Sequence, residues 1–274
     1  MKFNLLSQIG LFGILVFFFY QVVAQPQNEL LLPYLPNDTL TAKAKVNIEE
    51  ANIIPLQSNL HNYVARYLDE NAALLDQIKE RNSDKLKTIQ QILFKQGLPE
   101  GLKYLAIVES GLKNRATSRA GAAGIWQLMP ETARTLGLKV NATTDQRRQV
   151  YQSSQAAAKY LKTLYKEFDD WLLVVAAYNC GSGNVYKAIK KSGSRDFWKM
   201  QRYLPAETRG HVKHFIATHF HYEANGSMVT LTKKERNIYL ATLNKTVPEE
   251  AIPNTVKLTD SSKQPIVDII VARQ

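Results

Sequence analysis

Residues 97–112 read Gly97-Leu-Pro-Glu-Gly-Leu-Lys-Tyr-Leu-Ala-Ile-Val-Glu-Ser-Gly-Leu112, and they place the carboxylate of Glu109 inside an apolar helical stripe. Leu102, Leu105, Ala106 and Glu109 are spaced i, i+3, i+4 and i+7, so they share one helix face. Proline suits the first turn of a helix, and the Ser-Gly pair breaks the pattern at its end. The spacing predicts a helix over residues 99–109 with Glu109 in its last turn.

The position predicted for Glu109 favours a protonated carboxyl group. Desolvation disfavours the charged form, and the negative end of the helix dipole acts in the same direction. A carboxylic acid of this kind suits a general acid that protonates a leaving-group oxygen. The pattern alone also fits a helix-end glutamate that reaches water, so it does not by itself identify an enzyme.

The composition is that of a globular, basic protein. The chain has 274 residues, 45% of them hydrophobic, and 35 Lys plus Arg against 24 Asp plus Glu give a formal charge of +11. Its single cysteine, Cys180, excludes an internal disulfide and a cysteine-based zinc cage. The charge favours an anionic partner or surface.

Helical periodicity continues on both sides of Glu109 and predicts a mainly α fold. Apolar residues recur at helical spacing from Leu60 to Leu93, which predicts a helical hairpin over residues 58–97. No βαβ alternation is seen. Further helices are expected at 130–136, 149–168, 170–178, 184–191 and 205–222. The segments 228–232 and 266–271 resemble strands or extended chain, so residues 226–274 are expected to form an irregular tail of unknown role.

The N-terminus has the pattern of a targeting segment. Lys2 precedes an uninterrupted apolar and glycine run at 9–20, and Val22-Val-Ala24 offers small residues before Gln25. The pattern predicts a signal peptide over residues 1–24 and an exported protein, with an uncleaved membrane anchor as the alternative. Residues 25–57 contain four prolines and no sustained period, which indicates an extended lead-in.

Two further segments carry groups suited to a ligand. Arg119-Ala-Gly-Ala-Ala-Gly124 has little side-chain bulk and allows close backbone approach. Trp126 and Gln127 follow it, and an indole face and an amide are groups that contact sugars. Tyr178, before the glycines that follow Cys180, is placed to hydrogen-bond a buried carboxyl. Trp126 and Tyr178 fit core aromatics equally well.

Four ordered motifs carry a resemblance to a known family. They are Glu109-Ser-Gly-Leu112, Gly121-Ala-Ala-Gly-Ile-Trp-Gln-Leu-Met-Pro130, Ala176-Ala-Tyr-Asn179 and Leu204-Pro-Ala-Glu-Thr-Arg209. In order and spacing they resemble the bacterial lytic transglycosylases of the soluble-lytic-transglycosylase type, nearest the membrane-bound transglycosylase D branch. The resemblance covers about residues 55–225.

The resemblance implies a lysozyme-like helical catalytic domain at 98–225, preceded by the hairpin, that binds peptidoglycan glycan strands in the periplasm without a cofactor. Glu109 matches the single acid/base that cleaves the bond between N-acetylmuramic acid and N-acetylglucosamine and leaves a 1,6-anhydromuramoyl end. The positions that match substrate-binding residues are Ser110, Gln127, Met129, Tyr178, Asn179 and Glu207.

Some residues also fit other interpretations. His211 and His214, with Glu207 one turn earlier, have a spacing seen in metal sites, but no metal is expected because zinc needs a more complete ligand set. Nucleic acid is not expected either, since no nucleic-acid motif is present. A goose-type lysozyme-like muramidase and a non-catalytic peptidoglycan-binding protein stay open as alternatives, and the sequence identifies no protein partner.

Overall fold

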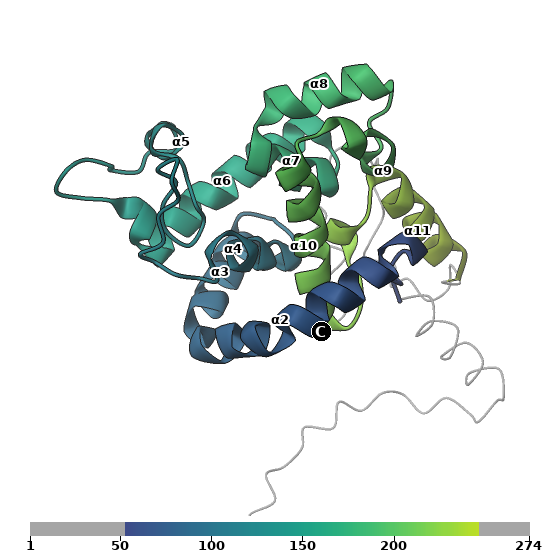
Figure 1. Cartoon of the computed structure of the whole chain (residues 1–274), viewed down its shortest axis with the longest axis horizontal. Helices are drawn as coiled ribbons and strands as arrows, with labels where there is room; N and C mark the ends of the chain where they lie inside the picture. The colour runs from purple at the N-terminus through teal and green to yellow at the C-terminus, as the bar shows by residue number, and fades with distance from the viewer. Residues whose placement is uncertain (1–52, 247–274) are drawn as a thin grey trace, which may run out of the picture.

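The computed structural model describes residues 53–246, which are mostly helical (Figure 1). Three isolated bridges between residues 117 and 145 are the β-pairings in this part of the chain. The expected mainly α class is therefore confirmed. The α-helices are α2 His61–Arg81, α3 Ser83–Lys95, α4 Lys103–Ser110, α5 Pro130–Thr135, α6 Val150–Phe168, α7 Trp171–Cys180, α8 Ser182–Ser192, α9 Phe197–Met200, α10 Ala206–Glu223 and α11 Lys233–Thr246.

Short 3-10 turns join several of these helices: η1 Ser58–Leu60, η2 Glu100–Leu102, η3 Gln146–Arg148, η4 Gln201–Tyr203 and η5 Met228–Thr230. The segment predicted as one helix from Pro99 is therefore a 3-10 turn followed by α4. Helix α9 was not predicted, because four residues are too short for a periodic pattern.

Helix α10 lies at the centre of the packing and contacts α2, α4 and α7 (Figure 1). Its buried residues include Val212, Phe215 and Ile216. Helix α7 is buried from Trp171 to Ala177 because its sequence is apolar on every side. The Asp170 carboxylate accepts hydrogen bonds from the backbone N–H groups of Leu172 at 2.9 Å and Leu173 at 3.1 Å, which fixes where α7 begins.

The predicted helical hairpin is an open corner. Helices α2 and α3 meet at Asn82 and then diverge, since α2 packs on α10 while α3 packs on α6 and α4 (Figure 1). The predicted inward positions are right, because Leu75 of α2 and Ile89 and Leu93 of α3 are buried. Periodicity identified the buried faces but not the helices that cover them.

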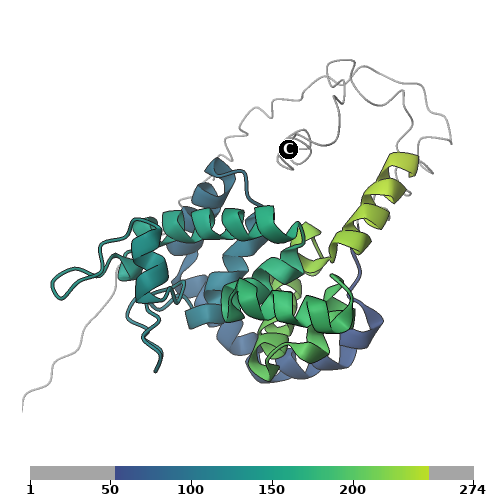
Figure 2. The same cartoon turned by 90° about the horizontal axis from the view of Figure 1, so that it is seen from above.

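The expectation of an irregular tail is wrong for residues 228–246. Ser227 caps η5, and the backbone N–H of Thr232 donates to the Glu235 carboxylate at 2.8 Å at the start of α11. Arg236 of α11 donates to Asp169 at 3.2 Å. Helix α11 lies at the opposite end of the molecule from α5 and its loops (Figure 2). The rest of the tail, the signal peptide and most of the lead-in lie outside the described residues.

No helix within residues 53–246 is both long enough and apolar enough to cross a membrane.

Candidate active site

Glu109 lies in the last turn of α4, on the helix face that the sequence predicted. Leu102, Leu105 and Ala106 are fully buried, and the Glu109 side chain is 12% exposed. Gly111 follows in the left-handed region at φ 59°, which ends the helix directly after Ser110. The structure therefore confirms a carboxyl group that is largely withdrawn from water on an otherwise apolar stripe.

The hydrogen-bond partner of Glu109 is His211 of α10. The distance from His211 Nε2 to Glu109 Oε1 is 2.9 Å, and the imidazole is 10% exposed. The sequence singled out His211 only as a possible metal ligand with His214. In the structure the two histidines have different partners. His211 pairs with Glu109, whereas His214 stacks on Tyr67 with a ring-centroid distance of 4.8 Å.

Tyr178 does not hydrogen-bond the carboxyl group, which corrects the expectation from sequence. Its hydroxyl donates to the carbonyl oxygen of Trp126 at 2.8 Å. Burial, and secondly the negative charge of Glu109, raise the pKa of Tyr178 well above its ordinary value. Tyr178 is therefore a neutral donor that lies close to Glu109. It supports the loop beside Glu109, which is formed by residues 111–129 between α4 and α5.

Ser110 holds the same loop from α4. Its Oγ donates to the carbonyl oxygen of Ile125 at 3.0 Å. The loop is thus tied to α4 next to Glu109 and, one residue further along, to Tyr178 of α7. Ser110 and Tyr178, both predicted to bind substrate, therefore both hydrogen-bond the Ile125–Trp126 backbone.

Trp126 is a core aromatic and not a platform for a sugar. It is fully buried, and its indole N–H donates to Ser154 Oγ at 2.9 Å. Gln127 has a left-handed φ of 46°, and its amide donates to the carbonyl oxygen of Gly124 at 2.8 Å. Met129 is 42% exposed. Of this motif, the side chain of Met129 is exposed and those of Gln127 and Pro130 are partly exposed.

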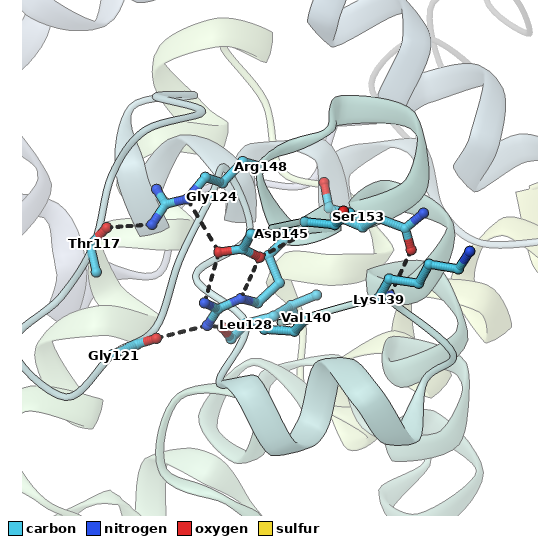
Figure 3. A network of polar contacts seen from close by, with 12 residues as sticks. Thr117, Gly121, Gly124, Leu128, Lys139, Val140, Asp145, Arg148 and Ser153 are labelled. Atoms are coloured by element: carbon cyan, nitrogen blue, oxygen red, sulfur yellow. Dashed lines mark hydrogen bonds and ion pairs between the residues drawn. The ribbon is translucent and has the colours of Figure 1, made fainter. Parts of the chain in front are cut away.

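A clamp of charged residues fixes the other side of the loop (Figure 3). The guanidinium of Arg147 is buried and donates to the carbonyl oxygens of Gly121 at 2.7 Å and Leu128 at 3.0 Å. Arg147 also pairs with Asp145 at 2.8 Å, and this hydrogen bond is the main cause of the lowered pKa of Asp145. Arg148 reaches Thr117 Oγ1 at 2.9 Å. No motif in the sequence predicted this clamp.

Asn179 and Glu207 lie where α7 meets α10. Thr208 Oγ1 donates to Asn179 Oδ1 at 2.7 Å, which joins the two helices. Glu207 is exposed one turn before His211 on α10. Within residues 53–246, no hydrogen bond or ion pair joins Glu207 or Met129 to Glu109.

Comparison with known proteins matches part of this chain to a known family. A family model described as Transglycosylase SLT domain matches residues 88–201. "Membrane-bound lytic murein transglycosylase D" of Escherichia coli (strain K12) is 41% identical over 169 residues, which is 60% of this chain and 37% of that protein. "Putative tributyltin chloride resistance protein" of Alteromonas sp. (strain M-1) is 30% identical over 151 residues, 55% of this chain and 69% of its own length.

Among solved structures, the 70 kDa soluble lytic transglycosylase Slt70 of Escherichia coli is 25% identical, with a TM-score of 0.49 over 63% of this chain and 32% of that one. The complex of the 70-kDa soluble lytic transglycosylase with bulgecin A is 21% identical, with a TM-score of 0.49 over 74% of this chain and 39% of that one.

The fold and the site define a helical protein that holds one largely buried carboxyl group beside a clamped loop. The chain belongs to the family of proteins that carry the transglycosylase SLT domain. It spans little more than a third, 37%, of the first curated relative that it matches.

Proposed function

We propose that this protein is a peptidoglycan lytic transglycosylase in which Glu109 is the single acid/base. The observation that carries the proposal is the side chain of Glu109, 12% exposed at the end of α4 and hydrogen-bonded to His211. Membership of the SLT-domain family and the name of the 41% identical relative support murein, or peptidoglycan, as the substrate.

In the proposed reaction, Glu109 donates its proton to the glycosidic oxygen between N-acetylmuramic acid and N-acetylglucosamine as the C1–O bond breaks. The resulting carboxylate then accepts the proton of the muramoyl 6-hydroxyl as O6 bonds to C1. The product carries a 1,6-anhydro bond, and no water is consumed. A single carboxyl group suffices for these two proton transfers, whereas most hydrolytic glycosidases use two. Glu207, the other carboxylate among the predicted site residues, is exposed on α10.

The other predicted residues have roles that fit their positions. Ser110 and Tyr178 fix the loop beside Glu109, so they shape the site through the Ile125–Trp126 backbone. Gln127, Met129, Asn179 and Glu207 are proposed to contact the glycan. The catalytic unit comprises residues 98–225 together with 58–97, whose helices α2 and α3 pack on α10, α6 and α4.

We further propose that residues 1–24 direct the protein to the periplasm, where peptidoglycan is accessible. The formal charge of +11 would favour contact with the carboxylates of peptidoglycan stem peptides. This contribution is expected to weaken as ionic strength rises, because exposed charges are screened over about 8 Å in physiological salt.

Replacement of Glu109 by Gln tests the assignment, since an amide of the same shape cannot donate the required proton. Glycan release from purified sacculi should fall by about a thousandfold. The melting temperature and binding to sacculi should stay close to wild type. A folded Glu109→Gln variant that still cleaved would refute the acid/base role. Wild-type protein that bound sacculi without cleaving them would instead indicate a non-catalytic binding protein.

A further inference from the structure

The contact between Glu109 and His211 joins the two helices that build the site, and no role for His211 follows from the sequence motifs. Helix α10 packs directly on α4, and the paired side chains are 10% and 12% exposed. Among the described residues, His211 is the hydrogen-bond partner of the Glu109 carboxyl group. A hydrogen bond that is largely withdrawn from water holds its partner more firmly than an exposed one.

The environment of the imidazole favours one tautomer. His211 Nδ1 is buried without a hydrogen-bond partner in the part of the chain that the structure describes. If the proton were on Nδ1, a buried N–H donor would be left unpaired, and such orphans are rare in native proteins. A proton on Nε2 instead makes the 2.9 Å contact an N–H donation to Glu109 Oε1. In that tautomer Nδ1 carries no proton, so the atom without a partner is a hydrogen-bond acceptor and not a donor.

This arrangement makes the two carboxyl oxygens of Glu109 different. Oε1 is occupied by the imidazole N–H, which leaves Oε2 as the oxygen that carries a transferable proton. We propose that His211 is a positioning residue that fixes the orientation of Glu109 and donates to the carboxylate formed midway through the reaction. This inference rests on the proposed transglycosylase function.

Both proton transfers of the proposed reaction take place at Oε2 of Glu109. The proton on Oε2 passes to the glycosidic oxygen as the C1–O bond breaks, and the 6-hydroxyl proton returns to Oε2 as the O6–C1 bond forms. His211 keeps its Nε2 proton throughout. The hydrogen bond strengthens when the carboxyl group becomes charged, because a donor to an ionised acceptor is roughly twice as strong as a neutral one. Loss of the His211 side chain should therefore lower the turnover rate more than it weakens substrate binding.

Two neighbours are less suited to this role. His214 lies one turn further along α10 and stacks on Tyr67. Tyr178 of α7 uses its hydroxyl on the Trp126 carbonyl. A matched pair of substitutions at His211 itself therefore isolates the hydrogen bond.

The experiment compares His211→Phe with His211→Gln, using soluble glycan strands of defined length as the substrate. Phenylalanine fills the space of the imidazole without a donor, whereas the glutamine amide supplies an N–H. We expect His211→Phe to lower kcat by about ten- to a hundredfold with KM within about twofold of wild type. His211→Gln should recover most of the lost kcat. Equal kcat in wild type and a folded His211→Phe variant would overturn the proposal, as would equal losses in the two folded variants.

A measurement on the unmutated protein keeps the test decisive if a variant fails to fold. Two-bond ¹H–¹⁵N spectra of histidine-labelled protein should show His211 as the neutral Nε2–H tautomer, and an Nδ1–H tautomer would contradict the proposal. Failure of the proposed function itself has a different signature, because wild-type protein would then release no glycan fragments.

Discussion

A Cβ atom added to Gly124 would lie 1.8 Å from the carbonyl oxygen of Arg147. At Gly124 the loop that carries Gln127 therefore lies so close to η3 that no side chain would fit between them. This contact, the Arg147 guanidinium, Ser110 and Tyr178 together fix the loop beside Glu109.

Gly124→Ala should destabilise the protein strongly, because both the backbone contact and a φ of +79° oppose a side chain. Gly121→Ala is the matched control, since Gly121 has a φ of +88° with no atom within 4 Å of the added Cβ. We expect a loss of about 1 kcal/mol in the free energy of unfolding for Gly121→Ala and at least about 3 kcal/mol for Gly124→Ala. Chemical denaturation measures both, and equal losses would show that the close contact is unimportant.

Arg147→Lys should weaken the clamp, because a lysine cannot pair with Asp145 and also reach the two carbonyl oxygens that Arg147 binds. The expected loss in unfolding free energy is about 2 kcal/mol. Arg134→Lys is the control, since its side chain is 50% exposed and its ion pair with Glu131 lies outside the clamp. Limited proteolysis should cut residues 114–128 faster in Arg147→Lys alone. Similar cutting rates in the two variants would contradict the role of Arg147.

Tyr178→Phe removes the donor to the Trp126 carbonyl and should lower the cleavage rate by about tenfold through displacement of the loop. The free energy of unfolding should fall by about 1 kcal/mol. Tyr160→Phe is the control, because its ring lies 5.4 Å from that of Tyr178 and its hydroxyl forms no hydrogen bond within residues 53–246. Its cleavage rate should match wild type. If Tyr178→Phe cleaved glycan at the wild-type rate, the role proposed for the Tyr178 hydroxyl would be refuted.

Stability should fall in mild acid because of His219, which is buried in α10 and hydrogen-bonded to Ser227 at 2.8 Å. Burial lowers the pKa of His219 from 6.5 to about 4. The unfolded chain therefore binds a proton first, so this contribution is fully present above pH 6.5 and is lost as the pH falls through 4. We expect a loss of about 3 kcal/mol.

His219→Gln provides the comparison for this pH dependence, because glutamine does not titrate. Urea unfolding at several pH values should give a smaller decrease between pH 6.5 and 4 in the variant than in wild type. Parallel pH profiles would show that His219 does not cause the decrease.

The sequence predicted local structure well, because helical periodicity reflects burial directly. The stripe that ends at Glu109 and the buried faces of α2 and α3 followed from spacing alone. Helix α11 was missed although Thr232-Lys-Lys-Glu235 has the form of a capping box, a local signal that precedes the helix. The β-branched residues of segment 228–232 obscured that signal.

The contacts that build the site were not predictable in the same way. His211 and Glu109 are 102 positions apart, so their pairing depends on how α10 packs on α4. The indole N–H of the buried Trp126 donates to Ser154 of α6, a residue 28 positions away that no local pattern connects to it. Motif order predicted the residues of the candidate site, whereas the helix packing decides which of them touch.

Mass spectrometry of the muropeptides that the purified protein releases from intact sacculi, with Glu109→Gln as the control, tests the central claim most directly. A lytic transglycosylase that uses Glu109 alone must release products with 1,6-anhydromuramoyl ends, and the control must release none. Products heavier by one water, with reducing muramoyl ends, would contradict the claim and identify a hydrolytic muramidase.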